Sequence, residues 1–179
     1  NDCLMTKFPQ GRALKYGDNI NTDIISPPAY MELPVAEAAA YAMSPIDPDF
    51  VKNCRPGAIF VAENNLGSGS SRETAPLTLK QLGITTVIAK SYARIFYRNC
   101  INLGILALEC QDTDKIAYHD LLTVDCQRGL IRNETKQESY RCDPIPGHIM
   151  AIIHCGGLFG YLKQKLAAAA TAERRDQDE

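Results

Sequence analysis

The stretch Ala58-Ile59-Phe60-Val61-Ala62 is an uninterrupted apolar run with the length of a buried β-strand. A loop rich in glycine, serine and asparagine follows it, and then come leucines with the spacing of a helix, at Leu77, Leu79 and Leu82. The same order repeats with an apolar strand over 85–89 and a helix over 93–103. Because strands that alternate with helices are typical of βαβ units, the sequence predicts an α/β core.

Segments on either side of this core extend the sheet. Residues 12–16 and 105–108 have strand character, and the apolar runs 121–124 and 130–131 flank the turn sequence Gln127-Arg128-Gly129. That pattern predicts an antiparallel hairpin, so we expect a mixed, partly parallel sheet flanked by helices. Gly156-Gly157 precedes a last helix. We expect a single domain over residues 1–170 and a charged, disordered tail over 171–179.

Composition limits the classes of function. The chain has 179 residues and a formal net charge of −2, and it has no basic stripe that could follow a phosphate backbone, so we expect no nucleic-acid partner. Its longest apolar stretches, 149–162 and 166–172, are shorter than the roughly 20 residues that cross a bilayer, so we expect no membrane partner. We predict a soluble, cytoplasmic protein, or an organellar one if a presequence has been removed.

Cysteine and histidine spacing argues against a metal bound by this chain. The seven cysteines lie far apart and include no Cys-x-x-Cys pair, which indicates free thiols in a reducing compartment. His119, His148 and His154 have no neighbours with metal-ligand spacing. We expect His154, in an apolar run read as a strand, to be a core residue. Arg94 and Arg98 either flank a cleft or pair with surface acids, and we favour surface pairing.

The loop Asn64-Asn65-Leu66-Gly67-Ser68-Gly69-Ser70-Ser71-Arg72-Glu73 is the best candidate for chemistry, because it joins a strand to a helix. Its glycines permit sharp turns, and its N–H groups together with Arg72 suit an oxyanion. The alternative is a capping box between Ser70 and Glu73. Pro76 disfavours that alternative, because a helix that began at Ser71 would hold this proline in its interior. A start near Glu73 or Thr74 leaves Ser70 and Arg72 in the loop.

Three segments together carry a family resemblance: Gly67–Glu73, Gly17–Ile25 and Ala93–Asn99. The chain resembles the small, swivelling subunit of the isopropylmalate dehydratase and homoaconitase branch of the aconitase superfamily. The resemblance implies a swivelling β/β/α domain that closes over a large subunit, as a heterodimer or heterotetramer. It also implies that the large subunit carries a [4Fe-4S] cluster, and that the pair is a hydro-lyase which dehydrates and rehydrates a small hydroxy diacid.

By this resemblance the loop residues acquire roles. Ser70 matches the serine whose alkoxide removes a proton beside a carboxylate, and Arg72 matches the residue that clamps a substrate carboxylate, with Ser71 and Gly69 beside it. Asp23 matches an active-site aspartate. Its alternative role is the cap of an Asx-type turn.

The loop Tyr30-Met31-Glu32-Leu33 matches the segment that reads the variable group of the substrate. The resemblance implies that an arginine at the third place accompanies an additional carboxylate, whereas an apolar residue there suits isopropylmalate. Glu32 departs from both patterns. If Glu32 points inward it repels a third carboxylate, while Met31 and Leu33 could line a slot for a branched alkyl group. The alternative is that Glu32 faces solvent.

We therefore predict the small subunit of 3-isopropylmalate dehydratase, an enzyme of leucine biosynthesis. Citramalate, dimethylmalate or homoaconitate hydro-lyases are related alternatives. A non-catalytic anion-binding module and a thiol redox protein are the competing classes.

Overall fold

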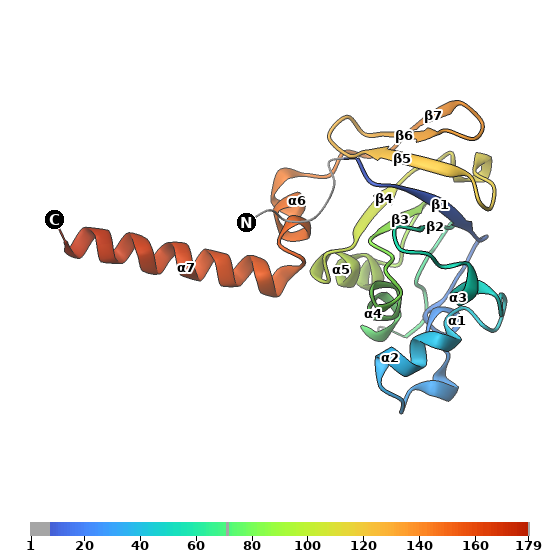
Figure 1. The fold of residues 1–179 in the computed structure, drawn as a ribbon, viewed down its shortest axis with the longest axis horizontal. Coiled ribbons are helices and arrows are strands. Elements are labelled where there is room, and N and C mark those ends of the chain that lie inside the picture. The colour runs from blue at the N-terminus through green and yellow to red at the C-terminus, as the bar shows by residue number, and fades with distance from the viewer. Residues whose placement is uncertain (1–7, 71, 179) are drawn as a thin grey trace.

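The computed structural model describes residues 8–70 and 72–178. Seven strands form one sheet in the order β4-β3-β2-β1-β5-β6-β7 (Figure 1). The strands are β1 (Gln10–Lys15), β2 (Ile59–Val61), β3 (Thr86–Ala89), β4 (Leu106–Glu109), β5 (Leu121–Asp125), β6 (Leu130–Asn133) and β7 (Glu138–Arg141). Strands β1 to β4 pair in parallel, whereas β1, β5, β6 and β7 pair antiparallel. The prediction of a mixed, partly parallel sheet with a hairpin at 121–131 is confirmed.

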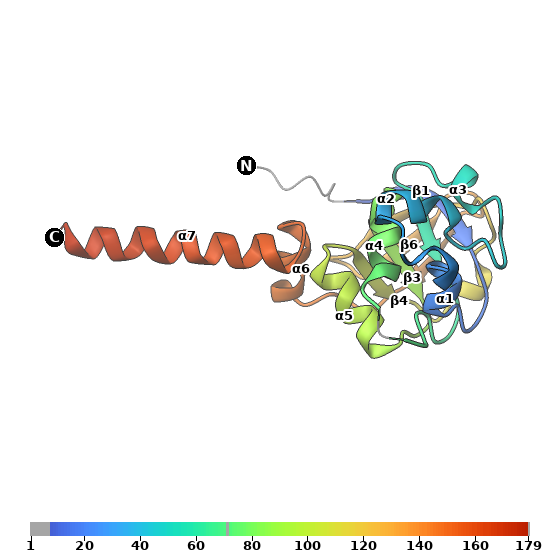
Figure 2. The ribbon, with the colours of Figure 1, turned by 90° about the horizontal axis from the view of Figure 1, so that it is seen from below.

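The helices of the core lie together on one side of the sheet (Figures 1 and 2). The α-helices are α1 (Thr22–Ile25), α2 (Val35–Ala38), α3 (Phe50–Asn53), α4 (Thr74–Gln81), α5 (Arg94–Asn102), α6 (Gly147–His154) and α7 (Leu158–Gln177), and the short 3-10 helices are Pro28–Tyr30, Ala39–Tyr41 and Thr113–Lys115. Helix α4 contacts α1, α2 and α5. The crossovers β2-α4-β3 and β3-α5-β4 are therefore the βαβ units that the sequence predicted.

Helix α4 begins where its proline allows. Glu73 is the N-cap residue, and Pro76 lies in the first turn and is buried. The first turn needs no donor at this position, so a proline is tolerated there. Because the helix starts at Thr74 and not at Ser71, Ser70 and Arg72 stay in the loop, as predicted.

The C-terminal region differs from the prediction in two respects. His154 ends helix α6 and is exposed, so its assignment to the core of a strand is wrong; an apolar run this short does not distinguish a strand from a helix. Helix α7 continues through Gln177, over most of the tail that was expected to be disordered. Alanines at 167–170 and 172 have the highest helix propensity of any residue, which accounts for this continuation.

Helix α7 extends away from the rest of the chain (Figures 1 and 2). Its 20 residues include several charges. Within the described ranges, neither α7 nor another helix has the length and apolar character that crossing a bilayer requires.

An ion network joins the ends of the parallel strands. Glu63, just after β2, lies 2.6 Å from Lys15 Nζ and 3.2 Å from Lys90 Nζ, and it accepts a hydrogen bond of 2.8 Å from Thr113. Burial alone would raise the pKa of Glu63, but the hydrogen bonds from Lys15, Thr113 and Lys90 outweigh burial and hold this pKa below its ordinary value. The network thus binds β1, β2 and the segment after β3 to one carboxylate.

We expect Glu63→Gln to lower the free energy of unfolding at pH 7 by about 1–3 kcal/mol, because it leaves two ammonium groups short of their acceptor. A depressed pKa stabilises the fold above the ordinary carboxyl value of 4.5 and ceases to do so as the pH falls through the lower pKa of the folded state. The difference between variant and wild type should therefore shrink in acid. Urea denaturation between pH 3 and 8 measures it. The exposed Glu37→Gln is the control, and a constant difference at every pH would contradict the assignment.

Candidate active site

The segments that leave β1, β2 and β3 meet at one edge of the sheet and are bound to one another by their backbones. Gly67 N–H donates to Ile20 O at 2.7 Å, and Ala93 N–H donates to Leu66 O at 2.9 Å. Because parallel strands end at the same edge, their loops converge there and can form a ligand site. The glycine-rich loop after β2 lies between the other two segments.

Gly67 fixes the distance between this loop and helix α5. Its φ of 84° is in the left-handed region, and a β-carbon on it would come within 2.0 Å of Phe96 Cγ. No other residue type can both adopt this backbone conformation without strain and leave room for the Phe96 ring. The loop therefore rests directly on the start of α5.

Ser70 is exposed at the end of this loop, next to α1. Thr22 Oγ1 donates a hydrogen bond of 3.0 Å to Ser70 O and lies 3.5 Å from Ser70 Oγ. Thr22 itself is buried, so the serine is held by a fixed neighbour. The N-cap residue of α4 is Glu73 and not Ser70, hence the alternative of a capping box between Ser70 and Glu73 is wrong.

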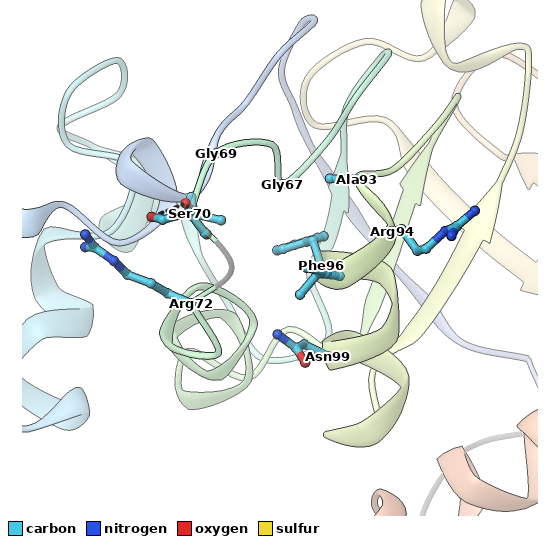
Figure 3. Close-up of a pocket in the computed structure, with 10 residues that line it drawn as sticks. Gly67, Gly69, Ser70, Arg72, Ala93, Arg94, Phe96 and Asn99 are labelled. Carbon is cyan, nitrogen blue, oxygen red and sulfur yellow. Dashed lines mark hydrogen bonds between the residues drawn. The ribbon is translucent and has the colours of Figure 1, made fainter.

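Arg72 extends from the start of α4 toward the side of the loop where Ser70 lies, away from Phe96 (Figure 3). Its Nη1 lies 3.8 Å from Asp23 Oδ1 and donates to Met31 Sδ at 2.6 Å. Asp23 is in the first turn of α1, but the cap of that helix is Asn21, whose side chain accepts from Ile24 N–H at 2.9 Å. The alternative role of Asp23 as a turn cap is therefore wrong, and Asp23 instead lies beside the guanidinium.

The loop and helix α5 enclose a pocket of about 200 Å³ (Figure 3). Its lining comes from three segments of the chain, and consists of Thr22, Gly67, Gly69, Ser70, Arg72, Ala93, Arg94, Ile95, Phe96 and Asn99. Three predicted site residues, Gly69, Ser70 and Arg72, are thus brought together. Ser71, a fourth, lies outside the described residues.

The electrostatic character of this pocket is positive. Arg72 and Arg94 both line it, while no carboxylate is among the described lining residues. Arg94 forms no ion pair within the described chain, so the expectation that it pairs with a surface acid is wrong. The Arg72 guanidinium lies on the side of the loop where Ser70 lies, whereas the Arg94 side chain extends away from Ser70 (Figure 3). A hydroxyl near one guanidinium and loop amides is suited to an anionic ligand.

The segment 30–33 lies close to Arg72 without lining the pocket. Tyr30 stacks on Tyr41 with ring centroids 3.8 Å apart, and Met31 contacts Arg72. Glu32 and Leu33 are exposed. The alternative that Glu32 faces solvent agrees with the structure, and Met31 is the residue of this segment that reaches the guanidinium.

The described cysteines do not fit an iron-sulfur cluster. Those at 54, 100, 110, 126, 142 and 155 are free thiols, and burial raises the pKa of Cys54 to about 11 and of Cys142 to about 12. Thiolates are the form that ligates iron, and burial disfavours them here. Within residues 8–70 and 72–178, no group of three or more His, Cys, Asp or Glu side chains is arranged to hold a metal ion.

Sequence reasoning assigned no role to Thr22, Phe96 or Asn99, which the structure places in the pocket lining. Phe96 and Asn99 lie three residues apart on the face of α5 that Gly67 approaches. Their presence in the family segment Ala93–Asn99 was the available signal. For Thr22 the signal was its position between Asn21 and Asp23, but the contact to Ser70 joins residues 48 positions apart and has no local pattern.

The mixed sheet and the pocket at the glycine-rich loop agree with the aconitase-type domain that the resemblance implies. In agreement, the family model described as the aconitase C-terminal domain matches residues 40–113. A crystal structure of 3-isopropylmalate dehydratase from Methanocaldococcus jannaschii superposes with a TM-score of 0.88 at 37% identity, covering 92% of this chain and 99% of that one.

Curated relatives extend the comparison to most of the chain. The 3-isopropylmalate dehydratase small subunit of Clostridium beijerinckii is 48% identical over 158 residues, which cover 87% of this chain and 98% of the relative. The 3-isopropylmalate dehydratase small subunit 2 of Archaeoglobus fulgidus is 51% identical over 156 residues, which cover 86% of this chain and 94% of the relative. The chain belongs to the 3-isopropylmalate dehydratase small-subunit family, and the resemblance read from the sequence is confirmed.

We expect Gly67→Ala to lower the free energy of unfolding by about 2–4 kcal/mol, since the added methyl group meets the Phe96 ring and the left-handed backbone disfavours an L-residue. Thermal and urea denaturation measure the change. Gly147→Ala is the matched control, because Gly147 has nothing within 4 Å of its β-carbon position. Equal stability of the two variants would contradict a close approach of the loop to α5.

Proposed function

We propose that this chain is the small subunit of a two-subunit hydro-lyase that converts 3-isopropylmalate by removing and re-adding water, a step of leucine biosynthesis. The observation that carries the proposal is the common placement of Ser70 and Arg72 on one positively charged pocket. The names of the relatives and of the superposed structure support the substrate.

Ser70 is the proposed base. A carbon–hydrogen bond beside a carboxylate is very weakly acidic, so the serine must act as an alkoxide whose charge is stabilised by its surroundings. Thr22 orients this serine through its contacts to Ser70 O and Oγ. Arg72, which lines the same pocket, adds positive charge on the side where Ser70 lies. The proton taken from carbon rests on Ser70 Oγ until water is added again.

Arg72 is the proposed clamp for a substrate carboxylate. A guanidinium binds a carboxylate through two parallel hydrogen bonds, and loop amides near Gly69 can bind the remaining oxygens. Asp23, 3.8 Å from Arg72 Nη1, orients the clamp. Ser71 adjoins both residues in the sequence and is proposed as a further substrate ligand.

The pocket is half of an active site. Ser70 and Gly69 are exposed, so water reaches the proposed base in the isolated chain. Alkoxide chemistry requires a water-poor site, which a second protein surface would provide by closing over the loop. We infer that the large subunit is this surface, in a heterodimer or heterotetramer.

Departure of the substrate hydroxyl needs a Lewis acid, which a [4Fe-4S] cluster supplies when bound. The described cysteines of this chain do not fit such a cluster, so we place it on the large subunit. This chain then contributes the base, the carboxylate clamp and the closing surface.

The segment 30–33 supports a dicarboxylate with an apolar group. Met31 contacts Arg72, so an alkyl group next to the clamped carboxylate would meet a thioether. Tyr30 is fixed by its stack on Tyr41, and the segment carries no cation that could bind a third carboxylate. Burial of an isopropyl group against such a surface contributes about 1.5–3 kcal/mol.

Ser70→Ala tests the catalytic assignment. In the complex reconstituted with the large subunit, we expect kcat for 3-isopropylmalate to fall about 10²–10⁴-fold, the contribution typical of a general base. Size-exclusion chromatography should show unchanged assembly, because Ser70 is exposed and removing its hydroxyl leaves the backbone bond from Thr22 intact. Ser139→Ala on β7 is the control. Full turnover by the Ser70 variant would remove the serine from the mechanism and favour a non-catalytic anion-binding module.

A substrate panel tests the choice of diacid. We expect kcat/KM for 3-isopropylmalate to exceed the values for citramalate, dimethylmalate and homoaconitate by about tenfold or more, the ratio expected from burial of the alkyl group. Met31→Ala should reduce this preference, and Glu32→Gln should leave it unchanged because Glu32 is exposed. Preference for homoaconitate would contradict the proposed substrate while leaving the reaction type intact.

A further inference from the structure

A second, larger cavity of about 380 Å³ lies where β1 begins, on the opposite edge of the sheet from the candidate active site. It is formed by the start of β1, the segment between α3 and β2, and the turn before β5. Gly11 lines this cavity, and Lys15, four residues later on β1, belongs to the ion network at the other end of the strand. About 13 Å of strand therefore separates the cavity from that network.

Four basic side chains surround this cavity: Arg12, Lys52, Arg55 and His119. Arg12, Lys52 and Arg55 form no ion pair with any residue of the described chain. The chain has 21 acidic and 19 basic residues, so acidic groups are not scarce. No carboxylate is among the described residues that line the cavity. Like charges gathered without counter-charges repel one another, and a bound anion would relieve that repulsion.

The backbone beneath these cations is closely packed. A β-carbon on Gly11 would come within 1.9 Å of Gly57 O, so β1 and the turn before β2 are in direct contact there. Arg12 Nη1 donates to His119 O at 3.4 Å. His119 has a φ of 71°, a conformation that costs energy for a residue other than glycine, and its N–H donates to Ala13 O at 2.8 Å. The backbone that carries Arg12 and His119 is therefore fixed, and the four basic side chains are exposed around it.

We propose that this cavity binds a small organic molecule carrying a phosphate group. Its volume is that of a small-molecule site and exceeds the need of an isolated ion. Two guanidinium groups and an ammonium match the two negative charges and three acceptor oxygens of a phosphate monoester better than the single charge of a carboxylate. The proposal concerns different residues from the proposed function and does not depend on it.

Adenosine monophosphate and inorganic phosphate are the probes, with citrate as the polycarboxylate comparison. Isothermal titration of the full chain at 0.15 M salt should give sub-millimolar dissociation constants for adenosine monophosphate and weaker binding of inorganic phosphate and citrate. The double variant Arg12→Gln/Arg55→Gln should raise the dissociation constant for adenosine monophosphate at least tenfold, because two charge-assisted contacts are lost. Arg174→Gln/Arg175→Gln on the exposed α7 changes the net charge equally and should have no effect.

Lys52→Gln at the end of α3 is a milder variant that keeps β1 intact, and it should weaken binding about threefold or more. Circular dichroism establishes that each variant is folded. Three results would each overturn the proposal: no binding of adenosine monophosphate below 5 mM, binding that is unchanged in both cavity variants, or citrate binding as tightly as adenosine monophosphate. The last would mean that the cavity selects charge and not phosphate.

Discussion

The ring of Phe96 lies where the β-carbon of any residue but glycine at position 67 would have to be. This contact holds the loop after β2 against the first turns of α5, and the loop then continues past α1, where Thr22 binds Ser70. The pocket thus depends on one steric constraint and a few backbone hydrogen bonds, and not on a network of charges. The loop and α5 therefore keep their positions whether or not an anion occupies the pocket, whereas the Arg72 side chain is oriented by its ion pair with Asp23.

Strand order determines which chemical groups can meet. Strands β1, β2 and β3 are adjacent and parallel, so the segments after them carry Thr22, Ser70 and Ala93 to one edge. The antiparallel strands β5, β6 and β7 widen the sheet on the other side and contribute nothing to the pocket lining. In this mixed sheet the parallel strands therefore position the site, whereas the antiparallel strands extend the hydrophobic core.

Much of the fold could be predicted because local rules agreed with it. Pro76 predicted the start of α4 correctly, and the turn residues at 127–129 predicted the β5–β6 hairpin. Prediction failed where local signals were ambiguous or absent. The apolar run that became α6 suits strand and helix equally, and the alanines of α7 were outweighed by the charges around them. The stack of Tyr30 on Tyr41 and the bond from Thr22 to Ser70 join segments that only the tertiary fold brings together.

The contacts of Arg72 in the free chain are weak enough for a substrate carboxylate to replace them. Its side chain is one-third exposed and its partner Asp23 is more than half exposed, at a distance of 3.8 Å. A pair this open contributes about 0–1 kcal/mol, and a thioether such as Met31 Sδ is a weak acceptor. A two-point bond to a carboxylate in a closed site is stronger than both together. Asp23 and Met31 therefore orient the guanidinium without binding it tightly, so a substrate carboxylate can replace them at little cost.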